Sequence, residues 1–154
     1  MAMSKLVESA REYVFTYFNA NPEVYDVIFT PNASGALKTV GESFPFTKGS
    51  RFLLLSDNHN SVNGIREFAK SKGATVTYSK PKLPDLRIDD QELLKELSNI
   101  DTSVHNLFAY PAQSNFTGVQ HDLKWIAHAQ TLGWSVLIDA AAFVPSNKLD
   151  LKVV

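Results

Sequence analysis

Hydrophobic positions along the chain change from helical spacing to an alternation of strand-like and helix-like segments. Residues 4–19 place apolar side chains at helical intervals, and the stretch Asn19–Pro22 ends that pattern. Short runs of β-forming residues then alternate with amphipathic stretches. They predict strands at 25–31, 51–57, 74–79, 104–111 and 134–141, and helices at 34–44, 61–73, 91–99 and 121–133.

This alternation predicts an α/β fold in which a mostly parallel sheet carries helices on both faces. The segment Arg51–Asp57 reads RFLLLSD and is apolar on both sides of the expected strand, which is typical of a parallel strand that is covered twice. The chain has 154 residues, of which 44% are hydrophobic, and it contains no internal repeat. We therefore expect one core and one main domain.

Composition and charge exclude several classes of function. The net charge of −1 argues against nucleic-acid and acidic-membrane binding. The chain has no cysteine, which removes disulfides, thiolate metal ligands and a cysteine nucleophile within it. Its four histidines show no ligand spacing, so no metal site is expected. No apolar run approaches the roughly 18 residues of a membrane span, and no signal peptide is visible, so a cytoplasmic location is expected.

Polar side chains follow four of the predicted strands, at the point where each strand ends. Ligands of open α/β sheets bind beyond the carboxyl ends of the strands. The residues at these ends are Asn32–Gly35, Asp57–Ser61, Gln113–Asn115 with Thr117, and Asp139. All of them can face one crevice, although polar loop residues are common in any fold.

The turn at Asn32–Gly35 has two interpretations. Small residues at the start of a helix let an anion approach the free N–H groups, so Ala33 and Ser34 are candidates for binding a phosphate. Alternatively, Asn32 or Ser34 simply caps the helix. The turn matches neither the GxGxxG fingerprint nor a Walker loop, which argues against a dinucleotide or a nucleoside triphosphate.

Asp139 and His59 are the candidate ionisable groups of this crevice. Asp139 ends the otherwise apolar strand WSVLID, and a carboxylate there needs a partner because burying an unpaired charge is costly. A structural role, in which Asp139 braces the following turn, remains open. His59 lies in SDNHNSV and is a candidate catalytic residue, with a structural or surface role as the alternative.

Four blocks of the sequence resemble a known family. They are FTPNASGALKTVGESFP, SDNHNSVNGIREFA, FAYPAQSNFTGVQHDLKWI and VLIDAAAFVPSNKLDL, which occur in this order between about Tyr25 and Leu151. Together they resemble the class V aminotransferase group of fold-type-I enzymes, which depend on pyridoxal 5′-phosphate. Within that group they are most similar to the N-terminal sulfurase region of the molybdenum cofactor sulfurases.

The resemblance implies a role for five residues. Ala33 and Ser34 match the pair that holds the cofactor phosphate, with serine in place of the commoner threonine. His59 matches the histidine that stacks on the pyridine ring, and Asn115 matches the asparagine that hydrogen-bonds its phenolic oxygen. Asp139 matches the aspartate that pairs with the protonated ring nitrogen and so makes the cofactor a better electron sink. Many class V members carry a glutamine at the position of Ala142, so one further contact to the phenolic oxygen is not expected.

The resemblance also implies a reaction and a domain organisation. It predicts an N-terminal helix and lead-in at 1–24, and at 25–154 a partial large domain that lacks the family's cofactor-binding lysine and persulfide cysteine. The implied reaction of the whole protein is transfer of sulfur from L-cysteine to the molybdenum cofactor. This chain alone is expected to be inactive and to bind its cofactor non-covalently at most. The alternative is a non-catalytic binding or assembly module.

Oligomer formation is a further expectation from the family. Class V enzymes are dimers, and the predicted first strand, 25–31, loses the neighbour with which the family pairs it. We therefore expect either self-association through open sheet edges or a changed position of this segment. A Rossmann-type oxidoreductase also fits the α/β pattern, but the glycine fingerprint is missing.

Overall fold

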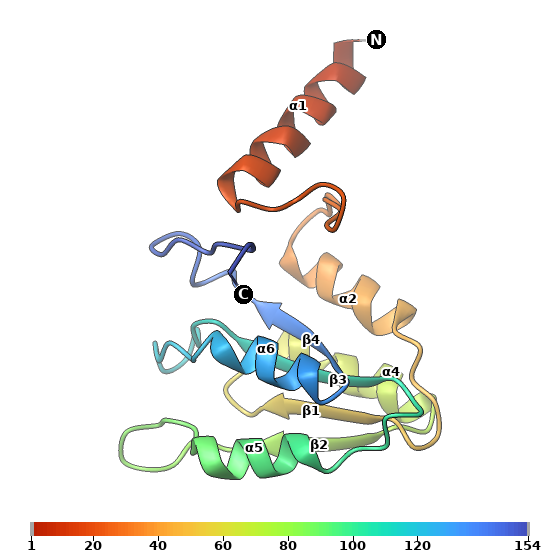
Figure 1. The fold of residues 1–154 in the computed structure, drawn as a ribbon, viewed down its shortest axis with the longest axis vertical. Coiled ribbons are helices and arrows are strands. Elements are labelled where there is room, and N and C mark those ends of the chain that lie inside the picture. Colours follow the sequence, from red (N-terminus) through yellow and green to blue (C-terminus); the bar gives the residue numbers. More distant parts are fainter. Residues whose placement is uncertain (1, 154) are drawn as a thin grey trace.

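The computed structural model describes residues 2–153, and its parallel sheet lies beneath a protruding N-terminal helix (Figure 1). The elements in chain order are α1 (Ala2–Tyr17), α2 (Ala33–Ser43), β1 (Arg51–Leu55), α3 (Asn60–Asn63), α4 (Ile65–Ser71), β2 (Thr75–Ser79), α5 (Asp90–Ser98), β3 (Asn106–Pro111), α6 (Lys124–Thr131) and β4 (Trp134–Asp139). None of the helices among these residues is long and apolar enough to cross a membrane.

The four strands form one parallel sheet in the order β2-β1-β3-β4. Leu53 of β1 stands opposite Thr77 on one side and Phe108 on the other, and Phe108 in turn stands opposite Val136. This confirms the predicted α/β class with a mostly parallel sheet.

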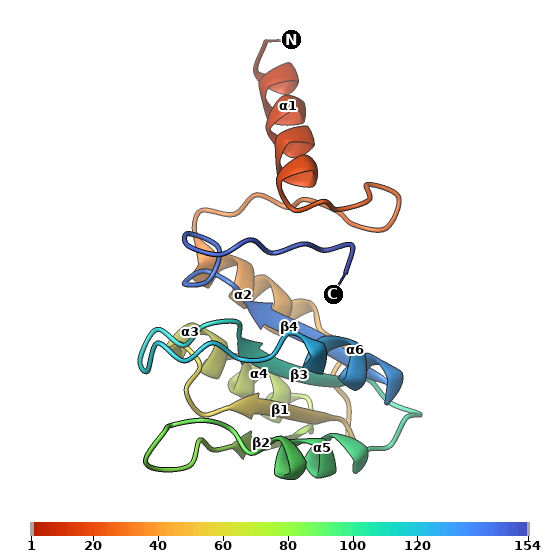
Figure 2. The ribbon, with the colours of Figure 1, turned by 60° about the vertical axis from the view of Figure 1, so that its left-hand side comes forward.

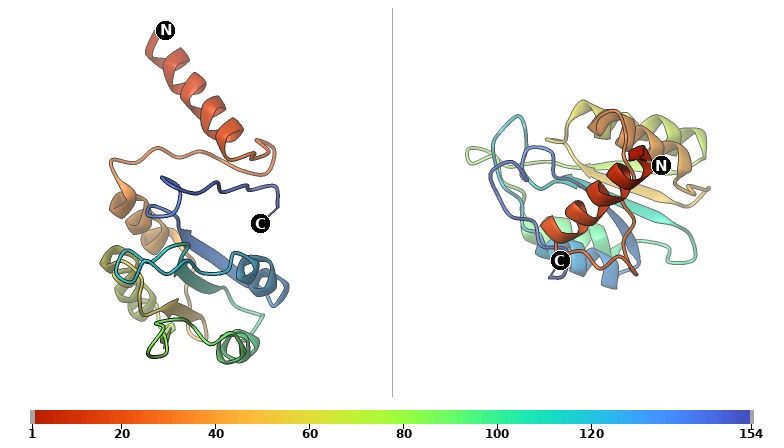
Figure 3. Two further views of the ribbon diagram at one scale, coloured as in Figure 1. Left: turned by 90° about the vertical axis from the view of Figure 1, so that its left-hand side faces the viewer. Right: turned by 90° about the horizontal axis from the view of Figure 1, so that it is seen from above.

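Helices cover both faces of the sheet because successive strand residues point to opposite sides. Leu53 and Phe108 pack with residues of α5 and α6, whereas Phe52 and Leu54 pack with residues of α2 and α4. Figure 3 shows the two helical layers with the sheet between them. All four side chains are fully buried, which explains why the β1 sequence is apolar without alternation.

The predicted strand at 25–31 is wrong. Residues 25–30 are extended but pair with no strand of the sheet, and they lead from α1 to α2 (Figure 2). Ile28 is 74% exposed and Phe29 52% exposed. The segment is held from the helix side instead, because the Arg11 side chain donates to the Val27 carbonyl at 3.3 Å and lies over the Phe29 ring. β-propensity alone therefore did not create a strand where no ladder partner was available.

Two predicted helices also change. The helix expected at 61–73 is divided into α3 and α4 around Gly64. The helix expected from residue 121 begins only at Lys124, whose N–H is accepted by the Asp122 side chain at 2.9 Å. His121 therefore lies outside α6, in the loop that precedes it.

The segment after β4 contacts the segment after α1. The Leu151 N–H donates to the Phe18 carbonyl at 2.8 Å, and the Tyr25 hydroxyl donates to the Leu151 carbonyl at 3.0 Å. The Asn19 amide donates to the Asp150 carboxylate at 3.0 Å. The division at residue 24 stays a prediction, although these contacts tie the lead-in to the main body.

Packing between α2 and α4 makes Gly41 sensitive to substitution. A Cβ at Gly41 would lie 2.7 Å from Cδ2 of Phe68, whereas a Cβ at Gly35 in the same helix would meet its nearest atom at an ordinary 3.5 Å. We expect Gly41→Ala to destabilise the protein by about 1 kcal/mol, because overpacking outweighs the gain in helix propensity. Gly35→Ala is the matched control and should be neutral or slightly stabilising. Urea denaturation checks both, and equal behaviour of the two variants would contradict the packing argument.

Candidate functional site

The loops that follow β1, β3 and β4 meet at the carboxyl edge of the sheet. The Ser114 hydroxyl donates to the Asp57 carbonyl at 3.0 Å, which joins the loops after β1 and β3. The Ala112 N–H donates to the Asp139 carbonyl at 2.8 Å, which joins the loop after β3 to the end of β4. These contacts join the three loops, but the polar side chains at their strand ends line two cavities and not one crevice.

The N-terminus of α2 is capped and still has free donors. Asn32 is the N-cap, and its side-chain oxygen accepts the Gly35 N–H at 2.9 Å. The N–H groups of Ala33 and Ser34 have no hydrogen-bond partner among residues 2–153. The capping interpretation is therefore correct for Asn32, while the two amides that were predicted to bind an anion remain available to one.

Ser61 links the start of α2 to His59. The Ser34 and Ser61 hydroxyl oxygens are 2.6 Å apart, and the Ser61 hydroxyl is 3.1 Å from His59 Nδ1. The same nitrogen accepts the Ser61 N–H at 3.2 Å, so His59 is also the N-cap of α3. The structural alternative for His59 is therefore present, and the residue is exposed. Sequence reasoning placed Ser61 in the crevice but gave it no role.

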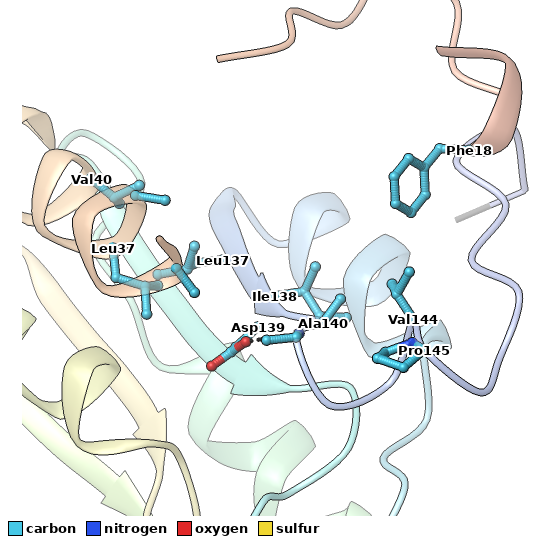
Figure 4. A pocket seen from close by; sticks show the side chains of 12 residues that line it. Phe18, Leu37, Val40, Leu137, Ile138, Asp139, Ala140, Val144 and Pro145 are labelled. Carbon is cyan, nitrogen blue, oxygen red and sulfur yellow. Dashed lines mark hydrogen bonds between the residues drawn. The ribbon is translucent and has the colours of Figure 1, made fainter. Parts of the chain in front are cut away.

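Asp139 and Ala33 line one cavity of about 480 Å³. Most of the other lining residues are apolar, and Figure 4 shows Leu37 and Val40 on one side, Phe18 on the other and Asp139 between them. The half-buried Asp139 accepts the Ala141 N–H through Oδ1 at 3.1 Å, which braces the turn after β4. No hydrogen bond among the described residues uses the second carboxylate oxygen.

His59 and Asn115 line a second cavity of about 360 Å³, on the side of the loops after β1 and β3. Its other lining residues are Ser56, Asp57, Asn58, Asn60, Asn63 and Phe116. The structure thus brings together Ala33 with Asp139 and His59 with Asn115, and it connects Ser34 to His59 through Ser61. It does not place all five predicted residues around a single cavity.

A buried Asp57–His121 pair is the polar contact that sequence reasoning missed. His121 Nε2 lies 2.9 Å from Asp57 Oδ2, and the two side chains are only 2% and 3% exposed, respectively. The sequence places Asp57 among the polar strand ends, but it predicts a helix that includes His121. The two residues are 64 positions apart, so no local pattern connects them.

Tyr110 is buried away from solvent at the carboxyl edge of the sheet. Its ring is fully buried against Trp125, and its hydroxyl donates to the Asp122 carbonyl at 3.2 Å. Burial is the main cause that raises the pKa of the Tyr110 hydroxyl well above its ordinary value. Tyr110 therefore acts as a neutral donor that positions the loop before α6, and it offers no acid–base chemistry near neutral pH.

Comparisons with known proteins show the family to which this chain belongs. Residues 1–154 match the aminotransferase class-V family. The chain is 39% identical to the molybdenum cofactor sulfurases of Oryza sativa subsp. japonica and Homo sapiens, over 92% and 94% of its length. It spans 21% and 18% of those two proteins, which is about a fifth of their length.

Solved structures share the fold. The cysteine desulfurase CsdA from Escherichia coli superposes with a TM-score of 0.80 at 24% identity, covering 95% of this chain and 36% of that one. The cystine C-S lyase C-DES, in complex with cysteine persulfide, superposes with a TM-score of 0.77 at 20% identity. The superposition covers 99% of this chain and 40% of the C-DES chain. The sheet and helices described above are therefore part of the fold-type-I architecture, and the chain belongs to the class-V aminotransferase family.

Proposed function

We propose that this chain forms the pyridoxal 5′-phosphate-binding part of a cysteine desulfurase-like enzyme of the molybdenum cofactor sulfurase type. The observation that carries the proposal is the pair of free N–H groups at Ala33 and Ser34. Ala33 lines the same cavity as the Asp139 carboxylate. Donors at one end suit a phosphate, and a carboxylate at the other suits a protonated ring nitrogen. A mutant of the related C-DES has been solved with glycine covalently linked to its PLP cofactor.

Each of the five residues has a stated task in this proposal. The Ala33 and Ser34 amides and the Ser34 hydroxyl bind the phosphate, and Asp139 holds a proton at the ring nitrogen. His59 covers one face of the ring, and Asn115 donates to the phenolic oxygen. When bound, the cofactor supplies an electron sink for chemistry at an amino acid. The proposal makes binding to this chain non-covalent; the residues that line the two cavities, among those described, include no lysine.

The substrate and acceptor belong to the whole protein. The names of the Oryza sativa and Homo sapiens relatives support the molybdenum cofactor as the acceptor. The name of the fold neighbour CsdA, a cysteine desulfurase, supports L-cysteine as the sulfur donor. The exposed apolar side chains of Ile28 and Phe29, beside unpaired backbone, support self-association as the way in which this surface is covered.

Titration with 4′-deoxypyridoxine 5′-phosphate tests the proposal. This analogue keeps the ring and the phosphate but has no aldehyde, so it cannot form an imine with any surface lysine. We expect saturable binding with one molecule per chain by calorimetry. Asp139→Ala should weaken it by about ten- to a hundred-fold, because a hydrogen bond to a charged group contributes about 1.5–3 kcal/mol.

Asp85→Ala is the matched control, because Asp85 is an exposed carboxylate outside both cavities. It should bind the analogue as the wild type does. If the wild type fails to bind at millimolar concentration, or if Asp139→Ala binds unchanged, the cofactor proposal is wrong. A non-catalytic module would then be the better description of this chain.

A further inference from the structure

The Asp57–His121 pair joins the two loops that carry the proposed ring contacts. Asp57 lies in the loop after β1, two residues before His59. His121 ends the loop after β3 that contains Asn115. The pair connects these loops through side chains that are nine-tenths or more buried, at a distance of 2.9 Å. Neither residue has a task among the five residues proposed above.

Other hydrogen bonds hold parts of these two loops, and the pair adds a buried side-chain contact between them. The Asn58 amide donates to the Ala109 carbonyl at 3.1 Å, and the Ser114 hydroxyl donates to the Asp57 carbonyl at 3.0 Å. Beyond these, the loop after β3 turns outward, and both Asn115 and Phe116 are exposed. The His121 N–H returns to the Ala112 carbonyl at 3.0 Å, so the pair closes this loop onto the loop that bears His59.

The Asp57 carboxylate depends on His121. Its Oδ1 atom is buried and has no hydrogen-bond partner among the described residues, while Oδ2 is bonded to the His121 imidazole. Removing the imidazole would leave a buried carboxylate without a side-chain partner, which is strongly unfavourable. The Asp57 loop would then have to move to reach water, and His59 would move with it.

We propose that Asp57 and His121 are a positioning pair that locks the loop after β1 to the loop after β3, so that His59 and Asn115 face the same cavity. The expected effect of the pair on the affinity for the cofactor ring rests on the proposed function. The lock itself is a property of the ligand-free chain. Side chains that support a site in this way determine how precisely its contacts are held.

Amide hydrogen exchange on the ligand-free chain tests the lock directly. In His121→Ala we expect amide exchange to be at least ten-fold faster at Ser114 and at position 121 in the loop after β3. The Asn58 amide in the loop after β1 should also exchange at least ten-fold faster. Exchange in β2 should stay at the wild-type rate, which shows that the fold persists. His128→Ala, at an exposed histidine of α6, is the matched control and should leave both loops unchanged.

Binding of the analogue tests the consequence. We expect His121→Ala to weaken 4′-deoxypyridoxine 5′-phosphate at least ten-fold while the affinity for inorganic phosphate falls much less, because the Ala33 and Ser34 amides that bind the phosphate belong to α2. His121→Gln keeps an N–H donor at similar reach and should restore most of the affinity. Asp57→Asn, which removes the charge, should give an intermediate loss.

The outcomes separate the two proposals. If wild-type protein does not bind the analogue, the proposed function fails, and the exchange experiment still decides whether the lock exists. If wild-type protein binds but His121→Ala binds equally well, with unchanged exchange in both loops, the positioning pair is overturned. A loss of analogue and inorganic phosphate affinity in parallel would also overturn it, since that result indicates general damage to the site.

Discussion

Phe108→Ala is expected to destabilise the protein by about 3–5 kcal/mol, the usual cost of replacing a fully buried phenylalanine by alanine. Phe108 is 0% exposed in the middle of β3, with neighbouring strands on both sides. Its ring stacks on Tyr110 with centroids 5.0 Å apart and belongs to the cluster beneath α5 and α6. Small domains have a free energy of unfolding of only about 5–15 kcal/mol, so this substitution removes a large part of it.

Urea denaturation followed by circular dichroism measures this loss. Phe116→Ala is the control, because it makes the same chemical change at a side chain that is 87% exposed. It should alter stability by no more than about 0.5 kcal/mol. Equal midpoints for the two variants would show that β3 is not the centre of the core.

Asn106→Ala is expected to cost about 3 kcal/mol, although it removes no apolar packing. Asn106 is fully buried at the start of β3, where its oxygen accepts the Arg51 N–H at 2.7 Å. Its amide donates to the carbonyls of Asp101 and Val104 at 2.8 and 3.1 Å. The substitution removes these three hydrogen bonds, each of which contributes about 1 kcal/mol.

Thermal and urea denaturation again provide the measurement, together with exchange rates at the Arg51 amide. Asn99→Ala is the matched control, because the exposed Asn99 side chain makes no hydrogen bond among the described residues. We expect the Arg51 amide to exchange faster in Asn106→Ala alone. Unchanged stability in that variant would mean that the turn before β3 is held by other contacts.

The regular elements were largely predictable because their information is local. The apolar run at 51–55 became β1, an inner strand of the sheet, and α5 begins after Asp89, whose side chain accepts the Glu92 N–H at 3.1 Å. Helix boundaries were less predictable. The Asp122 side chain moved the start of α6 to Lys124, which left His121 free to enter the core.

The sequence supplied candidate residues for the site but not their arrangement. A strand-end position and a family resemblance were enough to select Ser34, His59 and Asp139. The arrangement depends on contacts between distant segments, of which the hydroxyl contact between Ser34 and Ser61 is one. Local patterns carry no information about such a contact.

The sequence alone determined the fold class, and the tertiary structure decided which distant segments meet. Hydrophobic periodicity determined the α/β class, because burial of one helix face or two strand faces is encoded in neighbouring residues. Only the tertiary structure decided that residues 25–30 stay unpaired, since a strand exists only where a partner supplies the ladder. It also decided that Asp57 meets His121, because a buried charge takes the partner that the folded chain brings within reach.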